Sequence, residues 1–381
     1  MGIETVAPWD AIVVGGGPGG STAARRLARG GRRVLLLDAA RFPRTKLCAG
    51  WVTPSVWRHV EFSPEDYPLT IQPFSRATVE IDGRVLETRW SDTVGWGIVR
   101  SEFDDFLLRR AREAGAEVRE GTRVREVRRE GDAVSVDLDG DEIRAPFVIG
   151  AGGHHCPVAR ALGEIEGGET VVAALESETR IEPGRGTGHS SLEPGPELFF
   201  EPDLRGYGWR FVKGDRLNVG LGCTPGGVAL RRRCDSMLDR LGREGRLPAD
   251  VPLERMRGHA YAVRLSAPRL VAGPGFLLVG DAAGLARGLS GEGIGPAVES
   301  AAVAAGLLLD GGVGRDEVAA RYRREIDRRF GTGRPGRLAR ALAKLPRPAI
   351  EGSTRWIVRS GWLRRKLILE RLFGMRPRGE S

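Results

Sequence analysis

The feature that most constrains the fold is a glycine-rich turn between two apolar runs near the N-terminus. Residues 11–14 form a short apolar run with β-branched side chains, and Gly15-x-Gly17-x-x-Gly20 follows at once. Residues 21–30 then have helical spacing, and a second apolar run at 34–37 ends in Asp38. This order of strand, glycine turn, helix, strand and acid is typical of a nucleotide-binding Rossmann unit.

Each residue of this fingerprint has a separate physical task. Gly15 permits the tight turn, Gly17 lets a pyrophosphate approach the backbone, and Gly20 lets the helix pack closely on the strand. Backbone amides at the start of the helix face the phosphates, and Asp38 accepts hydrogen bonds from a ribose. The fingerprint alone does not distinguish NAD from FAD.

A second glycine turn in the C-terminal half identifies the cofactor through a resemblance. Residues 275–284 form an apolar strand that ends in Gly280-Asp281, and a helix is predicted over 294–309. Together with the Arg100-x-x-Phe-Asp104 element, this pattern resembles the glutathione-reductase-like FAD superfamily. The resemblance is to the branch that contains aromatic hydroxylases, flavin halogenases and geranylgeranyl reductases. It implies that FAD is bound, that Asp281 contacts its ribitol or pyrophosphate region, and that Arg100 lies near it. A surface ion pair between Arg100 and Asp104 is the structural alternative.

Residues 115–118 and 123–127 have the pattern of a strand pair. In the family the backbone at this place contacts the adenine, so the resemblance implies that role for Val124.

The segment Lys46-Leu-Cys48-Ala49-Gly50 is similar to the loop of geranylgeranyl reductases that runs beside the flavin. Ala49 stands where that family has its first glycine. The resemblance implies cofactor contacts for Lys46, Cys48 and Ala49. Cys48 is also a candidate proton donor, and the alternative is a buried small residue, since free cysteines are commonly buried.

Three aromatic residues alternate along a predicted strand at Tyr207, Trp209 and Phe211. The period of two places them on one face, and the pattern resembles the Tyr-x-Trp-x-Phe-Pro motif of the reductases, with Val212 in place of proline. We expect this face to wall an apolar substrate cavity opposite the flavin, with Tyr207 as a second candidate proton donor. The alternative is an ordinary aromatic core stripe.

The segment from Leu289 to Ala297 opens the second helix. Helix-start amides at Gly293 and Ile294 are expected to stabilise the reduced flavin, because they place positive charge near its anionic edge. Ser290 and Glu292 have a simpler interpretation as helix caps.

One position departs from the branch, because Gly152 replaces an aspartate that the hydroxylases tie to FAD and to reduced nicotinamide. This argues against reduction by NADPH in the manner of the hydroxylases. The electron donor is left open between NAD(P)H and a ferredoxin or other donor protein. His154 and His155 have no third partner at metal-ligand spacing, so no metal site is predicted.

The fold class that follows is α/β, with a discontinuous Rossmann-type FAD-binding domain, an antiparallel-sheet substrate domain and a helical C-terminal region. We place the FAD-binding domain at residues 1–75, 98–165 and 265–320, and the substrate domain at 76–97 and 166–264. Antiparallel strand patterns occur at 77–90, 170–181 and 197–223. The basic helical C-terminal region is placed at 321–381, with breaks at Pro335, Pro346 and Pro348.

The net charge of +9 is concentrated in the C-terminal region. From Arg321 onward 18 basic residues stand against 5 acidic ones, which leaves 41 against 45 in the rest. Solvated helix faces are the preferred interpretation; docking on an anionic membrane surface is the alternative, with Trp356–Phe373 as the candidate contact. The default for that segment is packing on the FAD-binding domain. Nothing resembles a nucleic-acid module, and the four scattered cysteines favour a reducing cytosol, with the protein free or peripheral at the membrane.

The sequence therefore predicts a flavin-dependent enzyme with a small, hydrophobic substrate. The leading hypothesis is reduction of isolated double bonds in a prenyl or other lipid chain by hydride from reduced FAD, with a proton from Cys48, Tyr207 or water. The second is a monooxygenase or halogenase acting on a small organic compound. The third is a non-catalytic flavin- or nucleic-acid-binding protein.

Overall fold

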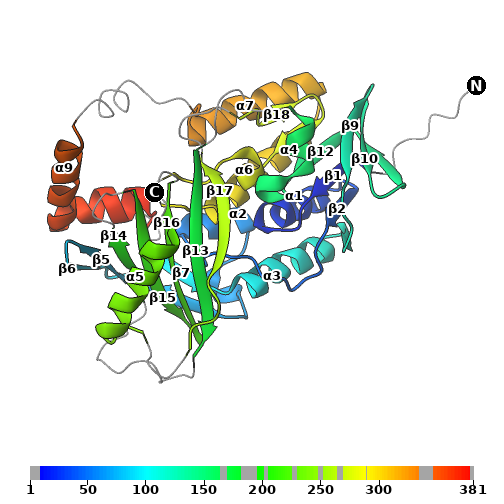
Figure 1. The fold of residues 1–381 in the computed structure, drawn as a ribbon. Helices are drawn as coiled ribbons and strands as arrows, with labels where there is room; N and C mark the ends of the chain where they lie inside the picture. The colour runs from blue at the N-terminus through cyan, green and yellow to red at the C-terminus, as the bar shows by residue number, and fades with distance from the viewer. Residues whose placement is uncertain are drawn as a thin grey trace, which may run out of the picture.

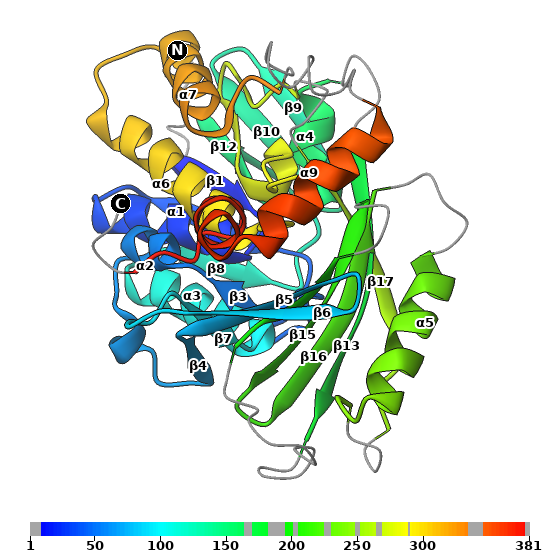
Figure 2. The same cartoon turned by 90° about the vertical axis from the view of Figure 1, so that its left-hand side faces the viewer.

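The computed structural model describes residues 9–163, 170–181, 195–200, 205–224, 230–247, 252–263, 269–288, 290–333 and 346–377. Within these ranges the chain forms a parallel sheet covered by helices and a second, larger and mostly antiparallel sheet beside it (Figures 1 and 2). The mixed α/β architecture confirms the predicted fold class. Pro335 lies outside the described residues.

The first sheet has six strands in the order β18-β19-β12-β1-β2-β8. All its pairings are parallel except β18 with β19. The strands are β1 (Ala11–Val14), β2 (Val34–Asp38), β8 (Glu117–Glu120), β12 (Phe147–Gly150), β18 (Ala272–Gly273) and β19 (Phe276–Leu278). Helices α1 (Pro18–Arg29), α3 (Arg100–Glu113), α4 (Pro157–Ala161), α6 (Ile294–Asp310) and α7 (Arg315–Phe330) pack around it. The central strands β1, β12 and β19 and most of β2 are apolar because both faces of the sheet are buried there, whereas the edge strand β8 carries charged, exposed residues.

The local sequence explains where α1 begins and ends. Pro18 occupies its first turn, where a missing N–H costs nothing, and the helix ends at Gly30. Ala23, Ala24 and Leu27 are fully buried against the sheet. Short 3₁₀ turns, η2 (Gly153–His155) and η3 (Gly280–Ala283), follow β12 and β19 at the same edge of the sheet.

The expected pairing of residues 115–118 with 123–127 is wrong. β8 instead extends the parallel sheet beside β2, and β9 (Glu126–Glu130) belongs to a separate meander with β10 (Ala133–Asp137) and β11 (Glu142–Ala145). The Thr122 amide donates to the Asp38 carbonyl, so the chain between the two segments follows β2 before it turns away. Tertiary pairing with β2 therefore overrides the local hairpin signal.

The second large sheet has seven strands in the order β17-β13-β16-β15-β14-β5-β6. They are β5 (Arg76–Ile81), β6 (Arg84–Arg89), β13 (Thr170–Arg180), β14 (Glu197–Phe200), β15 (Gly206–Lys213), β16 (Arg216–Cys223) and β17 (Arg257–Val263). The pairings are antiparallel, as predicted, except that β5 and β14 are parallel. Helix α5 (Leu230–Arg243), which the strand patterns did not predict, covers the outer face of the sheet (Figure 2).

A small sheet, β3-β7-β4, connects the two large ones. Its strands are β3 (Trp51–Val52), β4 (Ile71–Phe74) and β7 (Gly95–Ile98), and α2 (Pro54–Val60) and η1 (Pro64–Asp66) lie between β3 and β4 in the chain. An aromatic cluster around Trp57 fills the space between these elements and α3.

Residues 347–373 of the C-terminal region dock on the seven-stranded sheet, so the expected docking of Trp356–Phe373 on the FAD-binding domain is wrong. This segment consists of α9 (Arg347–Arg359), the single turn α10 (Gly361–Leu363) and the π-helix η4 (Arg364–Leu372), whereas residues 321–330 belong to α7 and pack on the parallel sheet. Val358, Leu369 and Phe373 are buried with β5 and β15 residues in one apolar cluster. Pro346 and Pro348 begin α9 rather than break a helix, because the first turn of a helix needs no proline N–H.

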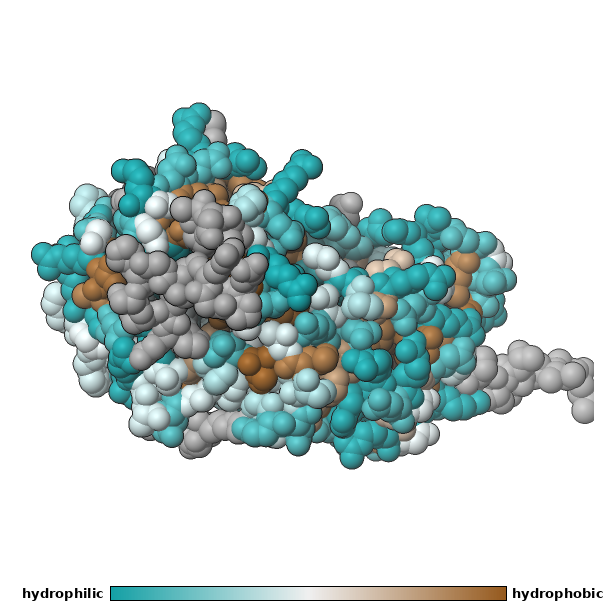
Figure 3. All heavy atoms as spheres, turned by 90° about the horizontal axis from the view of Figure 1, so that it is seen from below, coloured by the Kyte–Doolittle hydropathy of each residue, from teal (hydrophilic) through white to brown (hydrophobic). Residues whose placement is uncertain are grey.

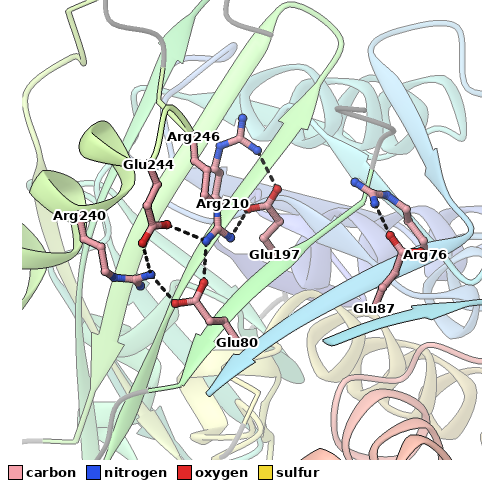
Figure 4. A network of polar contacts seen from close by, with 8 residues as sticks. All are labelled: Arg76, Glu80, Glu87, Glu197, Arg210, Arg240, Glu244 and Arg246. Carbon is pink, nitrogen blue, oxygen red and sulfur yellow. Dashed lines mark hydrogen bonds and ion pairs between the residues drawn. The ribbon is translucent and has the colours of Figure 1, made fainter. Parts of the chain in front are cut away.

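A network of ion pairs joins α5 and the chain after it to the outer face of the seven-stranded sheet (Figure 4). The Glu80 carboxylate, on β5, accepts from Arg240 and, at 2.6 Å, from Arg246. Glu197 on β14 accepts from Arg246 at 2.7 Å and from Arg210 at 3.1 Å. Glu80 and Arg210 are buried, so the free-energy cost of burying their charges is offset by these oppositely charged partners.

We expect Glu80→Gln to lower the free energy of unfolding by about 2 kcal/mol. Breaking a fully buried pair costs roughly 3–5 kcal/mol, and here the two arginines retain partial access to solvent. Urea unfolding measures the difference. Glu126→Gln, in an exposed pair with Arg128, is the matched control and should leave stability unchanged. Equal stabilities of the two variants would contradict a structural role for the network.

The face seen in Figure 3 is mostly hydrophilic, with apolar side chains in small separate patches. No helix among the described residues is long and apolar enough to cross a bilayer. Large apolar side chains that remain exposed in the C-terminal region include Trp356 and Trp362, which are 66% and 67% exposed.

Candidate active site

A cleft of about 330 Å³ opens at the carboxyl edge of the parallel sheet, where β1, β2 and β12 end. We call it the glycine cleft. Its lining includes Gly15, Gly17, Asp38, Arg44, Lys46, Arg100, Gly152, Gly280, Asp281, Gly293 and Ile294. Ligands of open α/β sheets bind at this edge, beside the point where the strand order reverses. The structure therefore brings the two glycine turns, 260 residues apart in the chain, into one site.

Two glycines of the first turn are required by close backbone contacts. Gly15 has φ of +110°, and a side chain there would meet the Ala151 carbonyl oxygen at 2.4 Å. A side chain at Gly20 would lie 1.8 Å from the carbonyl oxygen of Gly15. Gly17 differs, because the nearest atom to a Cβ there is the Arg44 guanidinium at 3.4 Å, in the lining of the cleft. The turn thus exposes the backbone of Gly17 to a ligand.

Asp38 is held in place by two backbone amides. The N–H of Gly16 donates to its Oδ2 at 2.6 Å, and the N–H of Ala40 donates to Oδ1 at 2.7 Å. Each carboxylate oxygen can accept a second hydrogen bond. The acid therefore fixes the glycine turn and still presents acceptors to a ribose in the cleft.

Arg100 forms a buried ion pair with Asp104 and also lines the cleft, so the expected surface position of the pair is wrong and the contact with FAD stays a prediction. Its Nε and one terminal nitrogen donate to the two Asp104 oxygens at 2.8 and 2.7 Å. Burial opposes the charged form of the guanidinium, but Asp104 outweighs this and raises the pKa of Arg100. The pair is buried, not at the surface, and Arg44 approaches the same carboxylate at 3.2 Å.

A second cavity, which we call the aromatic cavity, adjoins the glycine cleft. The two share Lys46, Arg100, Asp281, Gly293 and Ile294. The aromatic cavity is also lined by Cys48, Ala49 and six aromatic side chains: Trp51, Tyr207, Trp209, Phe211, Tyr261 and Phe373. A flavin whose phosphates lie in the glycine cleft can therefore extend its ring system directly into an apolar chamber.

Strand β15 supplies one wall, as its alternation predicts. Tyr207, Trp209 and Phe211 all line the aromatic cavity. Trp209 pairs across the ladder with Gly220, where a Cβ would meet the indole at 2.4 Å, and its Nε1 donates to Asn218 at 2.8 Å. The Tyr207 hydroxyl donates to the carbonyl of Ser290, and burial raises the pKa of this phenol.

Phe373 closes the cavity from the C-terminal region. Its ring stacks on Trp51 at 5.6 Å and meets Tyr207 edge-on at 5.4 Å. No local pattern pointed to this residue, since it follows a basic helix. Its place in the cavity depends on docking of the tail onto the sheet.

Ser290 and Glu292 do not cap α6, contrary to the simpler interpretation. Gly293 is the N-cap residue and no side chain caps the helix. Glu292 instead pairs with Arg287 at 2.9 Å and accepts from Thr53 at 3.1 Å. Leu289 lies outside the described residues.

Three polar residues of the cavity were missed by the sequence: Glu176, His259 and Tyr261. They lie on β13 and β17, on the face that carries the aromatic wall. Their alternation with apolar residues is also what a solvent-facing strand shows. Val124 is a different case, because it is not in the lining of the glycine cleft and packs in the core beside the parallel sheet.

Comparison with known proteins agrees with this geometry. Residues 10–170 match the family model of FAD dependent oxidoreductases. The chain is 32% identical to a menaquinone reductase of Mycolicibacterium smegmatis, over 80% of this chain and 77% of that one. It is 30% identical to digeranylgeranylglycerophospholipid reductase 1 of Methanopyrus kandleri, over 84% and 86% of the two chains. The chain belongs to the geranylgeranyl reductase family of FAD-dependent oxidoreductases.

One solved structure has the same fold as this geranylgeranyl reductase family member over nearly the whole length of the chain. A crystal structure of a geranylgeranyl bacteriochlorophyll reductase-like protein from Thermoplasma acidophilum superposes with a TM-score of 0.78, at 21% identity, and covers 96% of each chain. Membership confirms that the chain is an FAD-dependent oxidoreductase and that FAD is its cofactor. The glycine cleft fits that cofactor. No backbone atom lies close to Gly17 on the cleft side, so a pyrophosphate can approach its backbone, and Asp38 and Asp281 line the same cleft.

Proposed function

We propose that this enzyme reduces carbon–carbon double bonds of a prenyl or other lipid-like chain. The observation that carries the proposal is the continuity of the glycine cleft with a chamber walled by Trp51, Trp209, Phe211 and Phe373. Such a wall holds an aliphatic chain and keeps water from the reacting bond. Relatives named for the reduction of menaquinone and of a digeranylgeranyl lipid support the same substrate class.

FAD, when bound and reduced, supplies a hydride. We assign its phosphates and ribose to Gly15, Gly17, Gly20, Asp38, Gly280 and Asp281, and its ring system to Lys46, Cys48, Ala49, Arg100, Gly293 and Ile294. Helix-start amides at Gly293 and Ile294 favour negative charge on a bound group there, because the N-terminus of α6 carries positive partial charge. The adenine contact of Val124 stays a prediction, and so does the choice of NAD(P)H or a donor protein as reductant.

Tyr207 serves in this proposal as part of the wall. Its hydroxyl donates a hydrogen bond to the Ser290 carbonyl, and its raised pKa keeps the phenol protonated. Cys48 lines the cavity with its Sγ accepting from the Gly50 amide at 3.4 Å, and it stays a candidate for contact with the flavin.

An anaerobic half-reaction tests the proposed function. The purified holoenzyme is reduced with dithionite, a geranylgeranyl lipid is added, and the absorbance of oxidised flavin is followed. We expect reoxidation without oxygen and a product with one double bond fewer. No reoxidation by several prenyl lipids, together with oxygen-dependent turnover of an aromatic compound, would instead establish the monooxygenase or halogenase alternative.

Peripheral contact with a membrane stays a prediction. It now rests on the exposed Trp356 and Trp362 beside the basic side chains of the C-terminal region. These rings remain free for an interface after the tail has docked on the sheet. Flotation of the protein with anionic vesicles, compared with neutral ones, measures this contact.

A further inference from the structure

A buried carboxyl group with a free oxygen faces the aromatic cavity. Glu176, on β13, is 2% exposed and lines the cavity. It pairs across the ladder with Gly220, which in turn pairs with Trp209, so the carboxyl group and the aromatic wall share one face of the sheet. Its Oε2 atom has no hydrogen-bond partner among the described residues, and the backbone of Cys48 lies close to the carboxyl group. A buried polar atom left in this way is costly unless a proton or a ligand occupies it.

The charges around Glu176 come from three elements and a loop. They are Lys213 on β15, Glu178 on β13, Arg100 on α3 and, near the Cys48 loop, Lys46; His259 on β17 also faces the cavity. Burial raises the pKa of Glu176 to about 7, against the opposing effect of Lys213. Burial also lowers the pKa of His259 to about 4, so that imidazole is neutral at pH 7. Below pH 7 Glu176 therefore holds a proton, as do the phenols of Tyr207 and Tyr261, whose pKa burial raises.

A polar path leads from Glu176 toward solvent. Lys213 is fully buried, donates to the carbonyl of Ile98 at 3.0 Å and forms an ion pair with Glu178. The Glu178 side chain is 28% exposed, and Asn218 donates to it at 3.4 Å. A carboxylate at position 176 would be stabilised by the Lys213 ammonium and could regain its proton along this path.

Two other acidic side chains of the cavity are engaged. Glu292 is held by Arg287 and Thr53, and Tyr207 donates to the Ser290 carbonyl. Glu176 Oε2 has no hydrogen-bond partner among the described residues. Its position beside Cys48 also places it where the aromatic cavity adjoins the flavin-binding residues.

We propose that Glu176 is the proton donor of the reduction, with Lys213 and Glu178 as the route by which it is reprotonated. The inference rests on the proposed function. One carbon of the double bond accepts a hydride, with its electron pair, from reduced FAD. The other carbon takes the proton of the Glu176 carboxyl group. Two C–H bonds form as the π bond, the N–H bond that held the hydride on reduced FAD and the O–H bond of Glu176 break. The alkene gains two electrons, FAD is oxidised, and Glu176 remains as a carboxylate until solvent returns the proton.

The test is the anaerobic half-reaction with Glu176→Gln, which keeps the shape of the side chain and removes the acid. We expect reoxidation by the lipid to slow by about 10²–10⁴-fold, while reoxidation by oxygen is retained. The wild-type rate should fall as pH rises through about 7, because the acid form is lost, and the variant should not show this dependence. Ser177→Ala, the neighbour on the opposite face of β13, is the matched control and should react like wild type.

A second readout needs no turnover. Difference infrared titration of the oxidised protein should show a carboxyl band that disappears near pH 7 and is missing in Glu176→Gln. A Glu176→Gln variant with the wild-type rate and pH profile would overturn the inference. Failure of the wild type with every prenyl lipid would instead overturn the proposed function, and the inference with it.

Discussion

Replacing Gly20 by alanine is expected to give a colourless protein with a lowered free energy of unfolding. The new Cβ would stand 1.8 Å from the carbonyl oxygen of Gly15 and 3.1 Å from the Cβ of Ala151. The first of these neighbours is backbone in the turn itself, so α1 must move away from β1. Overpacking of this kind costs about 3 kcal/mol or more. The same movement carries the amides at the start of α1 out of the glycine cleft.

The ratio of flavin to protein absorbance and urea unfolding measure the two effects. Gly306→Ala is the matched control, because Gly306 lies inside α6 and nothing stands within 4 Å of a Cβ there. That change should raise stability by roughly 0.4–1 kcal/mol and leave the flavin content unchanged. A Gly20→Ala protein as yellow and as stable as wild type would show that the turn tolerates a side chain.

Removal of the Arg100 guanidinium is expected to cost about 3–5 kcal/mol of stability, as for other buried ion pairs. Arg100→Met leaves the fully buried Asp104 carboxylate with Arg44 alone, at 3.2 Å, in place of two hydrogen bonds from Arg100. Flavin affinity should fall as well, because Arg100 lines both the glycine cleft and the aromatic cavity.

Arg109→Met provides the comparison on the same helix. Arg109 pairs with Asp105 at 3.1 Å with the same i,i+4 spacing, but its side chain is 51% exposed. Solvent screens such a pair, and the loss should stay below about 1 kcal/mol. Arg100→Lys should recover part of the stability but not the two-pronged geometry of the guanidinium. If Arg100→Met costs no more than Arg109→Met, the buried pair does not stabilise the fold.

Much of the fold was predictable because its determinants are local. The β1–α1–β2 unit follows from the positive φ of Gly15 and from the close approach of Gly20 to the Gly15 carbonyl, which act within five residues of chain, although the atoms nearest to a Cβ at Gly15 belong to Ala151 and Gly152. The aromatic face of β15 follows from the period of two, which a strand imposes wherever it lies. The continuous apolar runs of β1 and β2 likewise indicate strands buried on both faces.

The pairing between strands was harder to predict from the sequence. The local patterns at 115–118 and 123–127 predicted two strands, and both segments contribute to strands, but β8 and β9 belong to different sheets. Which partner a strand finds depends on the competing edges available in three dimensions. The docking of the C-terminal segment also depends on surfaces that are available only in three dimensions. Its apolar side chains pack on the cluster around β5 and β15 and not on the FAD-binding helices.

The sequence by itself determined the nucleotide-binding unit and the aromatic wall, because each is encoded by residues whose spacing along the chain fixes their geometry. Its resemblance to a known family implied FAD. Only the tertiary structure decided which polar residues meet the substrate. Alternation on β13 says that Glu176 and Glu178 share a face, but not that this face is covered by a buried cavity. Burial depends on what packs above the strand, and here that is the loop at Cys48 and the C-terminal Phe373, which lie more than a hundred residues away in the chain.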